Sequence, residues 1–318
     1  MNLLSEQNYN KQFSNSLNDF LELHCQTDTV IYKKWKIFTI SATHKTPNHQ
    51  SIIIIQGRAE TSYKYLPLIF ELYHAGFNVY TFDHLGQGFS SRVGSSFYSY
   101  IPNFKDYTES TSVIIDHYKL ENFKVIGNSM GCAITIHLIN ENKIKTQQVA
   151  LVAPMILWNN INPLLRYTFF LLSKIVNAFN LLLKKEPSPF FGQIKYIKPN
   201  FESNNKTHSY QRYNFYHKIY EENPTIPVGG VTFEWIRQIM LNPVKIIKAP
   251  QTDLIIFLAE NELIVNNTNT ISVIENSKNS CHSIKYEIIR GAYHDILNES
   301  DSIRNPVIRK IEAFYQHE

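Results

Sequence analysis

A serine at the centre of a short glycine-flanked stretch could act as a catalytic nucleophile. Ser129 lies in Gly127-Asn128-Ser129-Met130-Gly131, which matches the pattern Gly-x-Ser-x-Gly. A predicted strand, Lys124–Ile126, ends directly before this stretch, and a predicted apolar helix, Met130–Ile139, begins inside it. So sharp a turn strains the serine backbone, and side chains at the flanking glycines would collide with it. Because the helix N-terminus favours developing negative charge, we predict that Ser129 is a nucleophile.

A serine hydroxyl is a weak nucleophile until a histidine accepts its proton. His294, in Gly291-Ala292-Tyr293-His294, follows the last predicted strand, Tyr286–Ile289, where a loop can bring it over Ser129. We expect most of the other eleven of the twelve histidines to be exposed or hydrogen-bonded in the core, including His137 in the helix after the serine. The sequence therefore predicts His294 as the general base.

A carboxylate should orient this histidine from the loop after the preceding strand, Leu254–Leu258. Glu260 and Glu262 are the candidates in Ala259-Glu260-Asn261-Glu262-Leu263-Ile264-Val265. We prefer Glu262. Glu260 remains an alternative because two positions so close in a tight loop can exchange roles.

Two backbone N–H groups are predicted to stabilise the oxyanion that forms during acyl transfer. One belongs to Met130, directly after the nucleophile. The other belongs to Arg58 in Gln56-Gly57-Arg58-Ala59-Glu60, which follows the predicted strand Ile52–Ile55. Gly57 permits the backbone to turn inward there, although an ordinary turn at the end of a strand would also use a glycine.

A second glycine-containing stretch, Asp83-His84-Leu85-Gly86-Gln87-Gly88-Phe89-Ser90, does not support a nucleotide site. It lacks the full G-x-G-x-x-G pattern and the acidic partner for a ribose. We interpret it as a structural turn beside the pocket.

Short apolar runs alternate with helical patterns and predict a doubly wound α/β core with a mostly parallel sheet. The predicted strands are Ile52–Ile55, Val79–Phe82, Lys124–Ile126, Val149–Val152, Leu254–Leu258 and Tyr286–Ile289. A helix over Leu66–Ala75 should stop at Gly76, and the last helix should begin near Pro306 behind Asn305. The alternation stops between Ala153 and about Pro243, so we expect core segments 1–156 and 244–318 with a mainly helical cap, 157–243, between them.

Composition narrows the classes of function. The net charge of +4 is small for 318 residues, and no run of Lys and Arg suits a phosphate backbone, so nucleic-acid binding is not expected. Cys25, Cys132 and Cys281 have neither disulfide nor metal-ligand spacing, and the proposed chemistry needs no metal or cofactor. Residues 1–10 lack the pattern of a secretory signal, so we expect a cytoplasmic protein.

The expected cap carries a basic, amphipathic stretch. Arg166, Ser173, Asn177, Asn180 and Lys184 form one polar stripe of a predicted helix whose other residues are mostly apolar. Residues 163–200 contain six basic side chains and one acidic side chain. Such a surface favours peripheral contact with an anionic membrane at its inner face, although the apolar face could instead seal the cap onto the core.

With these residues placed, the chain resembles the lysophospholipase L2 family, relatives of monoacylglycerol lipases within the α/β-hydrolase superfamily. The similarity runs from about Ser51 to Phe314. Its general part rests on Gln56-Gly57-Arg58-Ala59-Glu60, Phe82-Asp83-His84-Leu85-Gly86-Gln87-Gly88, the stretch around Ser129, Ala150-Leu151-Val152-Ala153-Pro154-Met155 and Gly291-Ala292-Tyr293-His294. Its more specific part is Thr207-His208-Ser209-Tyr210-Gln211-Arg212-Tyr213 and Asn223-Pro224-Thr225-Ile226-Pro227-Val228-Gly229-Gly230. Asn128 and Cys132 depart from the His and Gly usual in the superfamily.

The resemblance implies an α/β-hydrolase fold and hydrolysis of a lysophospholipid to a fatty acid and a glycerophosphodiester. Arg58, Arg212 and His208 are then candidate substrate-binding residues, since guanidinium groups match phosphate geometry. For Arg58, a salt bridge to Glu60 is an equally good interpretation. A monoacylglycerol lipase, a lysophospholipid acyltransferase and a non-catalytic lipid-binding protein are the alternatives. The sequence indicates neither the acyl length nor the oligomeric state.

Overall fold

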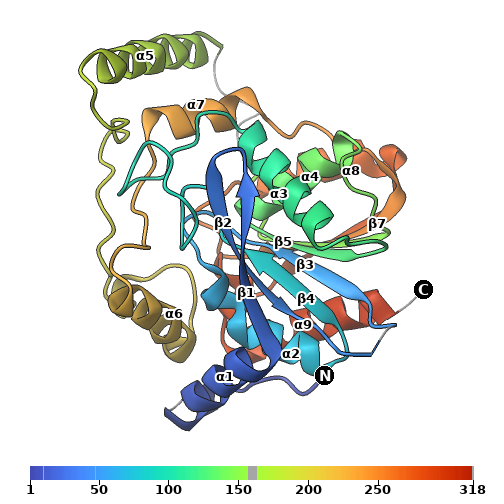
Figure 1. The fold of residues 1–318 in the computed structure, drawn as a ribbon. Coiled ribbons are helices and arrows are strands. Elements are labelled where there is room, and N and C mark those ends of the chain that lie inside the picture. Colours follow the sequence, from blue (N-terminus) through green and yellow to red (C-terminus); the bar gives the residue numbers. More distant parts are fainter. Residues whose placement is uncertain (10, 47, 157–162, 317–318) are drawn as a thin grey trace.

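The computed structural model describes residues 1–9, 11–46, 48–156 and 163–316, and within them one twisted sheet crosses the molecule (Figure 1). The sheet has eight strands in the order β1-β2-β4-β3-β5-β6-β7-β8. From β4 to β8 all neighbours are parallel, whereas β1 and β2 form an antiparallel hairpin at one edge. The strands are β1 (Cys25–Tyr32), β2 (Trp35–Ala42), β3 (Ser51–Ile55), β4 (Asn78–Phe82), β5 (Lys124–Asn128), β6 (Gln148–Val152), β7 (Ala249–Ala259) and β8 (Cys281–Ile289).

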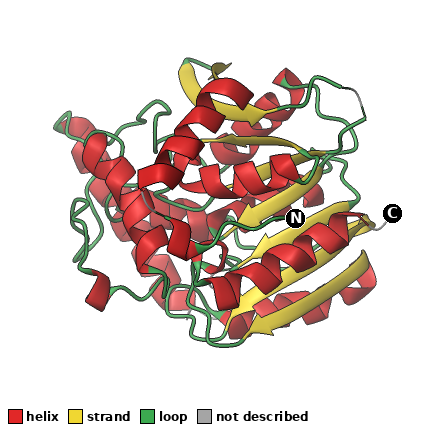
Figure 2. Ribbon diagram, turned by 90° about the horizontal axis from the view of Figure 1, so that it is seen from below, coloured by secondary structure: helices red, strands yellow, loops and turns green. Residues whose placement is uncertain are grey.

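Helices cover both faces of the sheet, as the view from below shows (Figure 2). The cluster of buried side chains on one face includes α3, α4 and α8, and the cluster on the other includes α1, α2 and α9. The helices are α1 (Lys11–His24), α2 (Leu66–His74), α3 (Lys105–His117), α4 (Met130–Asn140), α5 (Pro163–Leu182), α6 (Tyr210–Glu222), α7 (Phe233–Leu241), α8 (Asn267–Ser277) and α9 (Asp301–Gln316). Short 3-10 helices lie at Glu6–Asn8, Ser62–Tyr65, Phe201–Ser203, Lys278–Ser280 and Ile296–Asn298.

The predicted α/β class is confirmed, and the six predicted strands correspond to β3 through β8. The sequence analysis missed β1 and β2. Only two of the eight side chains of β1 are buried, so this edge strand lacks the continuous apolar run that marked the others.

Successive side chains of β3 enter opposite layers of the core. Ile53 and Ile55 pack with α3 and α4, whereas Ile52 and Ile54 pack with α1, α2 and α9. All four are fully buried, and such burial contributes about 1.5–3 kcal/mol for each side chain. The strand that precedes the predicted oxyanion turn is therefore held from both sides.

Helix α9 begins at Asp301, and the predicted start near Pro306 is wrong. Proline lacks the N–H that would bond one turn back, so it usually marks a first turn. Here the N–H groups of Ile303 and Arg304 already donate to the carbonyl of Ser300. The buried Arg304 guanidinium also pairs with Glu71 of α2. These contacts establish the helix before the proline.

The connection between β6 and β7, residues 157–243, is called the insertion below. Its described part contributes α5, α6 and α7 and no strand of the sheet, and α5 packs on α7 away from the core (Figure 1). Gly230 donates its N–H to Ile194 (2.9 Å), and Gly229 donates to Phe97 (2.8 Å) in the loop after β4. A Cβ at Gly229 would lie 2.4 Å from the Ile194 carbonyl oxygen, so this close approach requires glycine.

Within the described ranges, no helix combines the length and apolar character that crossing a bilayer would require.

Replacing Arg304 with Met should lower the free energy of unfolding by about 3–5 kcal/mol, because Glu71 would remain buried without its cation. The matched control is Lys310→Met on the same helix, which removes an exposed pair with Glu287 and should cost about 1 kcal/mol or less. Urea unfolding measures both. Equal losses for the two variants would contradict this account of the α9 anchor.

Candidate active site

Loops at the carboxyl ends of four parallel strands meet at one edge of the sheet. Arg58 follows β3, Ser129 follows β5, Glu262 follows β7 and His294 follows β8. Between this edge and the insertion lies a cavity of about 480 Å³, whose walls include Arg58, Ser129 and His294. A parallel sheet places ligand sites at this edge.

Ser129 sits in the strained turn that the sequence predicted. Its backbone has φ 51° and ψ −111°, a conformation that costs about 1–3 kcal/mol for a residue with a side chain. A Cβ at Gly131 would lie 1.8 Å from the carbonyl oxygen of Ile55. A Cβ at Gly127 would lie 3.1 Å from the Cα of Cys132. The two glycines therefore let α4 start directly against the end of β3.

The structure brings Ser129, His294 and Glu262 together in one hydrogen-bonded row. Ser129 Oγ lies 3.0 Å from His294 Nε2, and His294 Nδ1 lies 2.7 Å from Glu262 Oε2. Burial alone would raise the pKa of Glu262, but the hydrogen bond and charge of His294 and the N–H groups of Ile264 and Val265 outweigh burial and lower it. An ionised Glu262 accepts the Nδ1 proton, which leaves Nε2 free to accept the serine proton.

Glu260, the alternative acid, does not contact His294. Its Oε2 accepts the backbone N–H of Gly291 (2.7 Å), so it holds the start of the loop that carries His294. Of the two candidates, only Glu262 contacts the imidazole.

The turn predicted to supply the second oxyanion donor is braced on both sides of Arg58. The N–H of Gly57 donates to Glu60 Oε2 (2.7 Å), and the N–H of Ala59 donates to Gln87 Oε1 (2.9 Å). No acceptor among the described residues takes the N–H of Arg58. Met130 is the first residue of α4, where the helix offers its N–H no acceptor. Both predicted donors therefore remain available to a ligand.

A buried ionic chain, which the sequence analysis missed, joins this turn to the histidine loop. Lys64 lies 2.6 Å from Glu60 and 2.8 Å from Asp295, and Asp295 directly follows His294. Burial favours the neutral acid, but Lys64, Tyr65 and the Gly57 N–H prevail and lower the pKa of Glu60 to about 2. The spacing of Glu60 and Lys64 was a local signal for one of these two ion pairs. The other pair joins Lys64 to Asp295, which lies far away in the sequence.

The side chain of Arg58 does not pair with Glu60, so that interpretation is wrong. Its Nη1 donates to Ser99 Oγ (2.8 Å) and to the carbonyl of Gly229 (2.9 Å) in the insertion. Its guanidinium also lies 5.7 Å from the ring centroid of Trp235. Arg58 therefore lines the cavity and links the core to the insertion.

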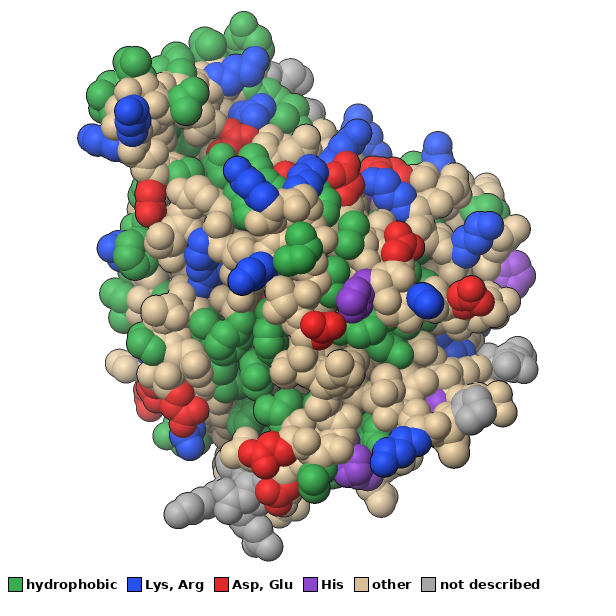
Figure 3. Space-filling view, in the orientation of Figure 1, with side chains coloured by type: hydrophobic (Ala, Val, Ile, Leu, Met, Phe, Trp, Pro, Cys, Tyr) green, Lys and Arg blue, Asp and Glu red, His purple; other side chains and the backbone are tan. Residues whose placement is uncertain are grey.

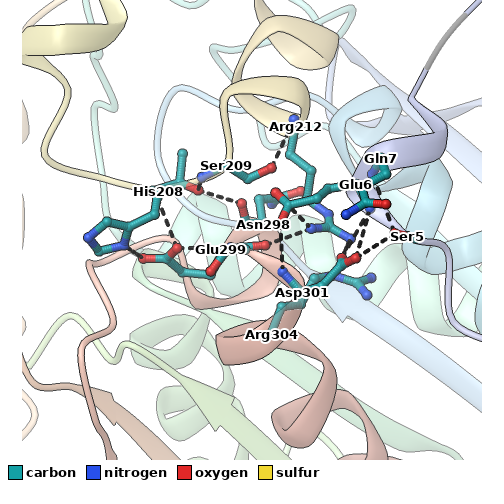
Figure 4. A network of polar contacts seen from close by, with 12 residues as sticks. Ser5, Glu6, Gln7, His208, Ser209, Arg212, Asn298, Glu299, Asp301 and Arg304 are labelled. Atoms are coloured by element: carbon teal, nitrogen blue, oxygen red, sulfur yellow. Dashed lines mark hydrogen bonds and ion pairs between the residues drawn. The ribbon is translucent and has the colours of Figure 1, made fainter.

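Arg212 and His208 do not line the cavity. Both belong to a network of polar contacts that includes Glu299 and Asp301 (Figure 4). Arg212 is buried and pairs with Asp301 at 2.6 Å, and it also donates to the carbonyl groups of Leu4 and Glu299. His208 Nδ1 lies 2.9 Å from the buried carboxylate of Glu299. These contacts tie α6 to the N-terminal segment and α9, so both residues have an anchoring position outside the cavity lining.

The stretch Asp83–Ser90 braces the site, as the structural interpretation predicted. The Asp83 carboxylate accepts the N–H groups of Ser62 (2.5 Å) and Phe89 (2.7 Å). The Gln87 amide donates to the carbonyl groups of Gly57 (2.9 Å) and Glu60 (3.1 Å). This stretch therefore fixes the oxyanion turn from behind.

The two residues that depart from the superfamily pattern lie beneath the nucleophile. Asn128 donates to the Tyr65 hydroxyl (2.9 Å), and Cys132 lies with its Sγ 3.1 Å from the carbonyl oxygen of Gly127. Burial raises the pKa of the Cys132 thiol. Neither side chain reaches the cavity lining.

Among the described residues, no group of three or more His, Cys, Asp or Glu side chains could hold a metal ion. A larger hollow of about 750 Å³ lies at the opposite end of the strands, beside Lys124 and Gln148, and none of the residues discussed above for catalysis lines it.

The fold and the hydrogen-bonded row of Ser129, His294 and Glu262 together indicate the class of protein to which the chain belongs. Residues 46–301 match the model of the family described as serine aminopeptidase, S33, and the chain belongs to this α/β-hydrolase family. Among individual proteins, the chain is 27% identical over 283 residues to lysophospholipase L2 of Escherichia coli, covering 85% of this chain and 82% of that protein. It is 27% identical over 274 residues to a probable lysophospholipase L2 of Haemophilus influenzae, covering 83% of this chain and 82% of that protein. A soluble variant of monoglyceride lipase from Saccharomyces cerevisiae has the same fold, with a TM-score of 0.65, 16% identity and coverage of 92% and 96% of the two chains.

Glu60→Gln should make stability less sensitive to acid. The pKa of Glu60 is lowered by folding, so its carboxylate stabilises the fold above pH 4.5, and this contribution is lost as the pH falls toward about 2. Wild type should therefore exceed Glu60→Gln in free energy of unfolding at about pH 7, and the gap should narrow at about pH 3. Urea titrations at both pH values measure it. Glu275→Gln, which loses an exposed pair with Lys278, is the control, and a gap that stays constant with pH would contradict the assignment.

Proposed function

We propose that this protein hydrolyses the carboxylic ester of a single-chain lipid, with a lysophospholipid as substrate and a monoacylglycerol as the alternative. The observation that carries the proposal is the hydrogen-bonded row of Ser129, His294 and Glu262 at the floor of the cavity. The relatives named lysophospholipase L2 and the shared fold with a monoglyceride lipase support the same substrate class.

In the first half-reaction, Ser129 Oγ attacks the acyl carbonyl carbon while His294 Nε2 accepts the hydroxyl proton. The N–H groups of Arg58 and Met130 stabilise the resulting oxyanion. The bond between the carbonyl carbon and the glycerol oxygen then breaks, and His294 gives its proton to that oxygen. Glu262 stabilises the imidazolium throughout and holds the ring in position.

In the second half-reaction, a water molecule attacks the acyl group on Ser129 and His294 accepts a proton from the water. Collapse of the second oxyanion releases the fatty acid, and His294 returns the proton to Ser129. Every proton moves between His294 and one of three oxygens: the Ser129 hydroxyl, the departing glycerol oxygen or the attacking water. An acyltransferase would replace the water with an alcohol, so product analysis in the presence of glycerol distinguishes the two reactions.

The cavity walls suit one acyl chain. Their apolar side chains come from both the core and the insertion, which is typical of a site that removes a hydrocarbon chain from water. They include Met155, Ile194, Ile197, Val228, Trp235, Ile264 and Val265.

The family description names an aminopeptidase, but the charges in the cavity favour an ester without a free ammonium group. An aminopeptidase needs a carboxylate to receive the amino terminus of its substrate. Glu60 and Asp295 are the acidic side chains of the cavity lining, and both are paired with Lys64.

Glu262→Gln should lower kcat by about 10⁴-fold, because the amide favours the wrong tautomer of His294. Ser129→Ala should lower kcat at least as strongly. The matched control is Glu260→Gln, which alters a backbone contact of the same loop and should stay within about 10-fold of wild type. Steady-state hydrolysis of a lysophospholipid measures all three. A loss at position 260 that equals the loss at position 262 would return Glu260 to the role of the acid.

The insertion is also proposed to act as a cap that rests on an anionic membrane. Three polar side chains in the middle of its helix α5, Ser173, Asn177 and Asn180, face the protein. Ser173 and Asn180 are buried, and Asn177 hydrogen-bonds to Glu234 of α7. Many apolar side chains of α5 face outward, whereas Phe169 packs against Phe190 and Phe233. The exposed ones include Leu164, Tyr167, Leu171, Leu172, Ile175, Phe179, Leu181 and Leu182.

Apolar side chains and basic groups gather on this protruding part of the molecule (Figure 3). The apolar exposure continues at Phe191, Ile194 and Ile197, next to the cavity. Six basic residues and one acidic residue lie in 163–200. Anionic lipid head groups complement this charge, and the acyl region accepts the apolar side chains.

Replacing both Ile175 and Phe179 with Ser should weaken binding to anionic vesicles by about 10-fold or more, since each buried apolar side chain contributes about 1.5–3 kcal/mol. Leu23→Ser, at an even more exposed position on α1, is the control. Co-sedimentation with vesicles of phosphatidylglycerol and phosphatidylcholine measures the change. Equal binding of the double variant and wild type would remove α5 from the proposed membrane surface.

A further inference from the structure

The cavity that contains Ser129 has an excess of positive charge. Its lining includes four basic side chains, Arg58, Lys64, Lys195 and Lys206, and two acidic ones, Glu60 and Asp295. Both carboxylates are engaged by Lys64. A site for an entirely neutral ligand would not need the remaining cations, because each loses hydration when the ligand fills the cavity.

Lys206 is the cation that the fold fixes beside the catalytic histidine. It lies between the 3-10 helix Phe201–Ser203 and α6, and its carbonyl oxygen accepts the N–H of Asp295 at 2.8 Å. Asp295 directly follows His294, so the backbone of Lys206 is tied to the loop that carries the base. Both Lys206 and His294 line the cavity.

Among the described residues, no carboxylate lies within 4.0 Å of the Lys206 ammonium group. Lys206 is exposed to solvent. Partial desolvation by the surrounding protein, together with the charges of Arg58 and Lys64, lowers the pKa of Lys206. An anion bound there would relieve the repulsion among the three cations.

The reaction geometry determines which half of the substrate meets Lys206. His294 must donate its proton to the departing alcohol oxygen, so the alcohol half of the ester lies on the side of His294. In a lysophospholipid this half carries the phosphodiester. Arg58 approaches from the turn after β3, and among the described residues only its Nη1 donates hydrogen bonds, to the neutral acceptors Ser99 and Gly229.

We infer that Lys206, assisted by the Arg58 guanidinium, forms an anion-binding subsite for the phosphodiester in the alcohol half of the substrate. This inference rests on the proposed ester hydrolysis and assigns its head-group preference. It replaces Arg212 and His208, which bind within the protein. A monoacylglycerol would leave the same cations without an anion, so the subsite makes the phosphate-bearing substrate the better one.

The test compares a monoacyl glycerophosphoglycerol with the monoacylglycerol of the same acyl chain, both as monomers in solution without vesicles. Lys206→Met should lower the ratio of their kcat/KM values by about 10-fold or more, mainly through a higher KM for the phosphodiester. Lys206→Arg should restore most of the ratio, because a guanidinium also binds phosphate. The control is Lys218→Met on α6, a side chain that is 66% exposed and pairs with Glu222 outside the cavity lining.

The possible outcomes distinguish a failure of the proposed subsite from a failure of the proposed ester hydrolysis. If wild type hydrolyses both lipids and Lys206→Met leaves their ratio unchanged, the subsite is refuted and the ester hydrolysis stands. If Lys206→Met slows both substrates equally, Lys206 has a structural role and the subsite is also refuted. If wild type hydrolyses neither lipid, the proposed function itself fails.

Discussion

Gly131 lies so close to the carboxyl end of β3 that a side chain there would collide with the carbonyl oxygen of Ile55. The remaining geometry of the site depends on this approach. It lets α4 begin beside the turn that carries Arg58, where a Cβ at Gly57 would lie only 3.3 Å from the Cβ of Ser129. The burial of β3 on both faces keeps the Ile55 carbonyl in place, and the strained backbone of Ser129 persists because packing around it leaves no relaxed alternative.

A second constraint is electrostatic. Lys64 bridges Glu60, which holds the oxyanion turn, and Asp295, which adjoins the base. Burying three charges is costly, and this cost is offset by close pairing and by the hydrogen bonds that Tyr65 and Gly57 give to Glu60. The ionic chain thus couples the turn after β3 to the loop that carries His294.

The sequence predicted the parts of the site that carry a local pattern. Ser129 was visible from its glycines, and His294 and Glu262 from their places after consecutive strands. The choice between Glu260 and Glu262 needed coordinates, since a shift of two residues in a loop changes only the direction of the side chain. The pairing of Lys64 with Asp295 and the contact of the Lys206 carbonyl with the Asp295 N–H were missed because they join residues that lie far apart in the chain. Arg212 was misjudged for the same reason, since Asp301 and the N-terminal segment occupy its guanidinium.

The helices and strands differ in the same way: those with a local sequence pattern were predicted, and those without one were missed. Buried parallel strands and the helix after Ser129 have unbroken apolar patterns, whereas the half-exposed hairpin of β1 and β2 has none. Ser173, Asn177 and Asn180 of the predicted polar stripe do lie on one side of α5, but periodicity alone does not tell which side of a helix faces solvent. Contacts with α7 decide this, and they turn the apolar side outward.

The most direct measurement of the central claim is mass mapping of the protein after reaction with a fluorophosphonate that carries one long alkyl chain. Its tetrahedral phosphorus captures a serine whose proton a histidine removes, and its chain requires the apolar cavity. The account predicts one adduct, on Ser129, whose formation slows when lysophospholipid is present and nearly stops in His294→Ala. An adduct on another residue, or none on folded protein, would contradict it.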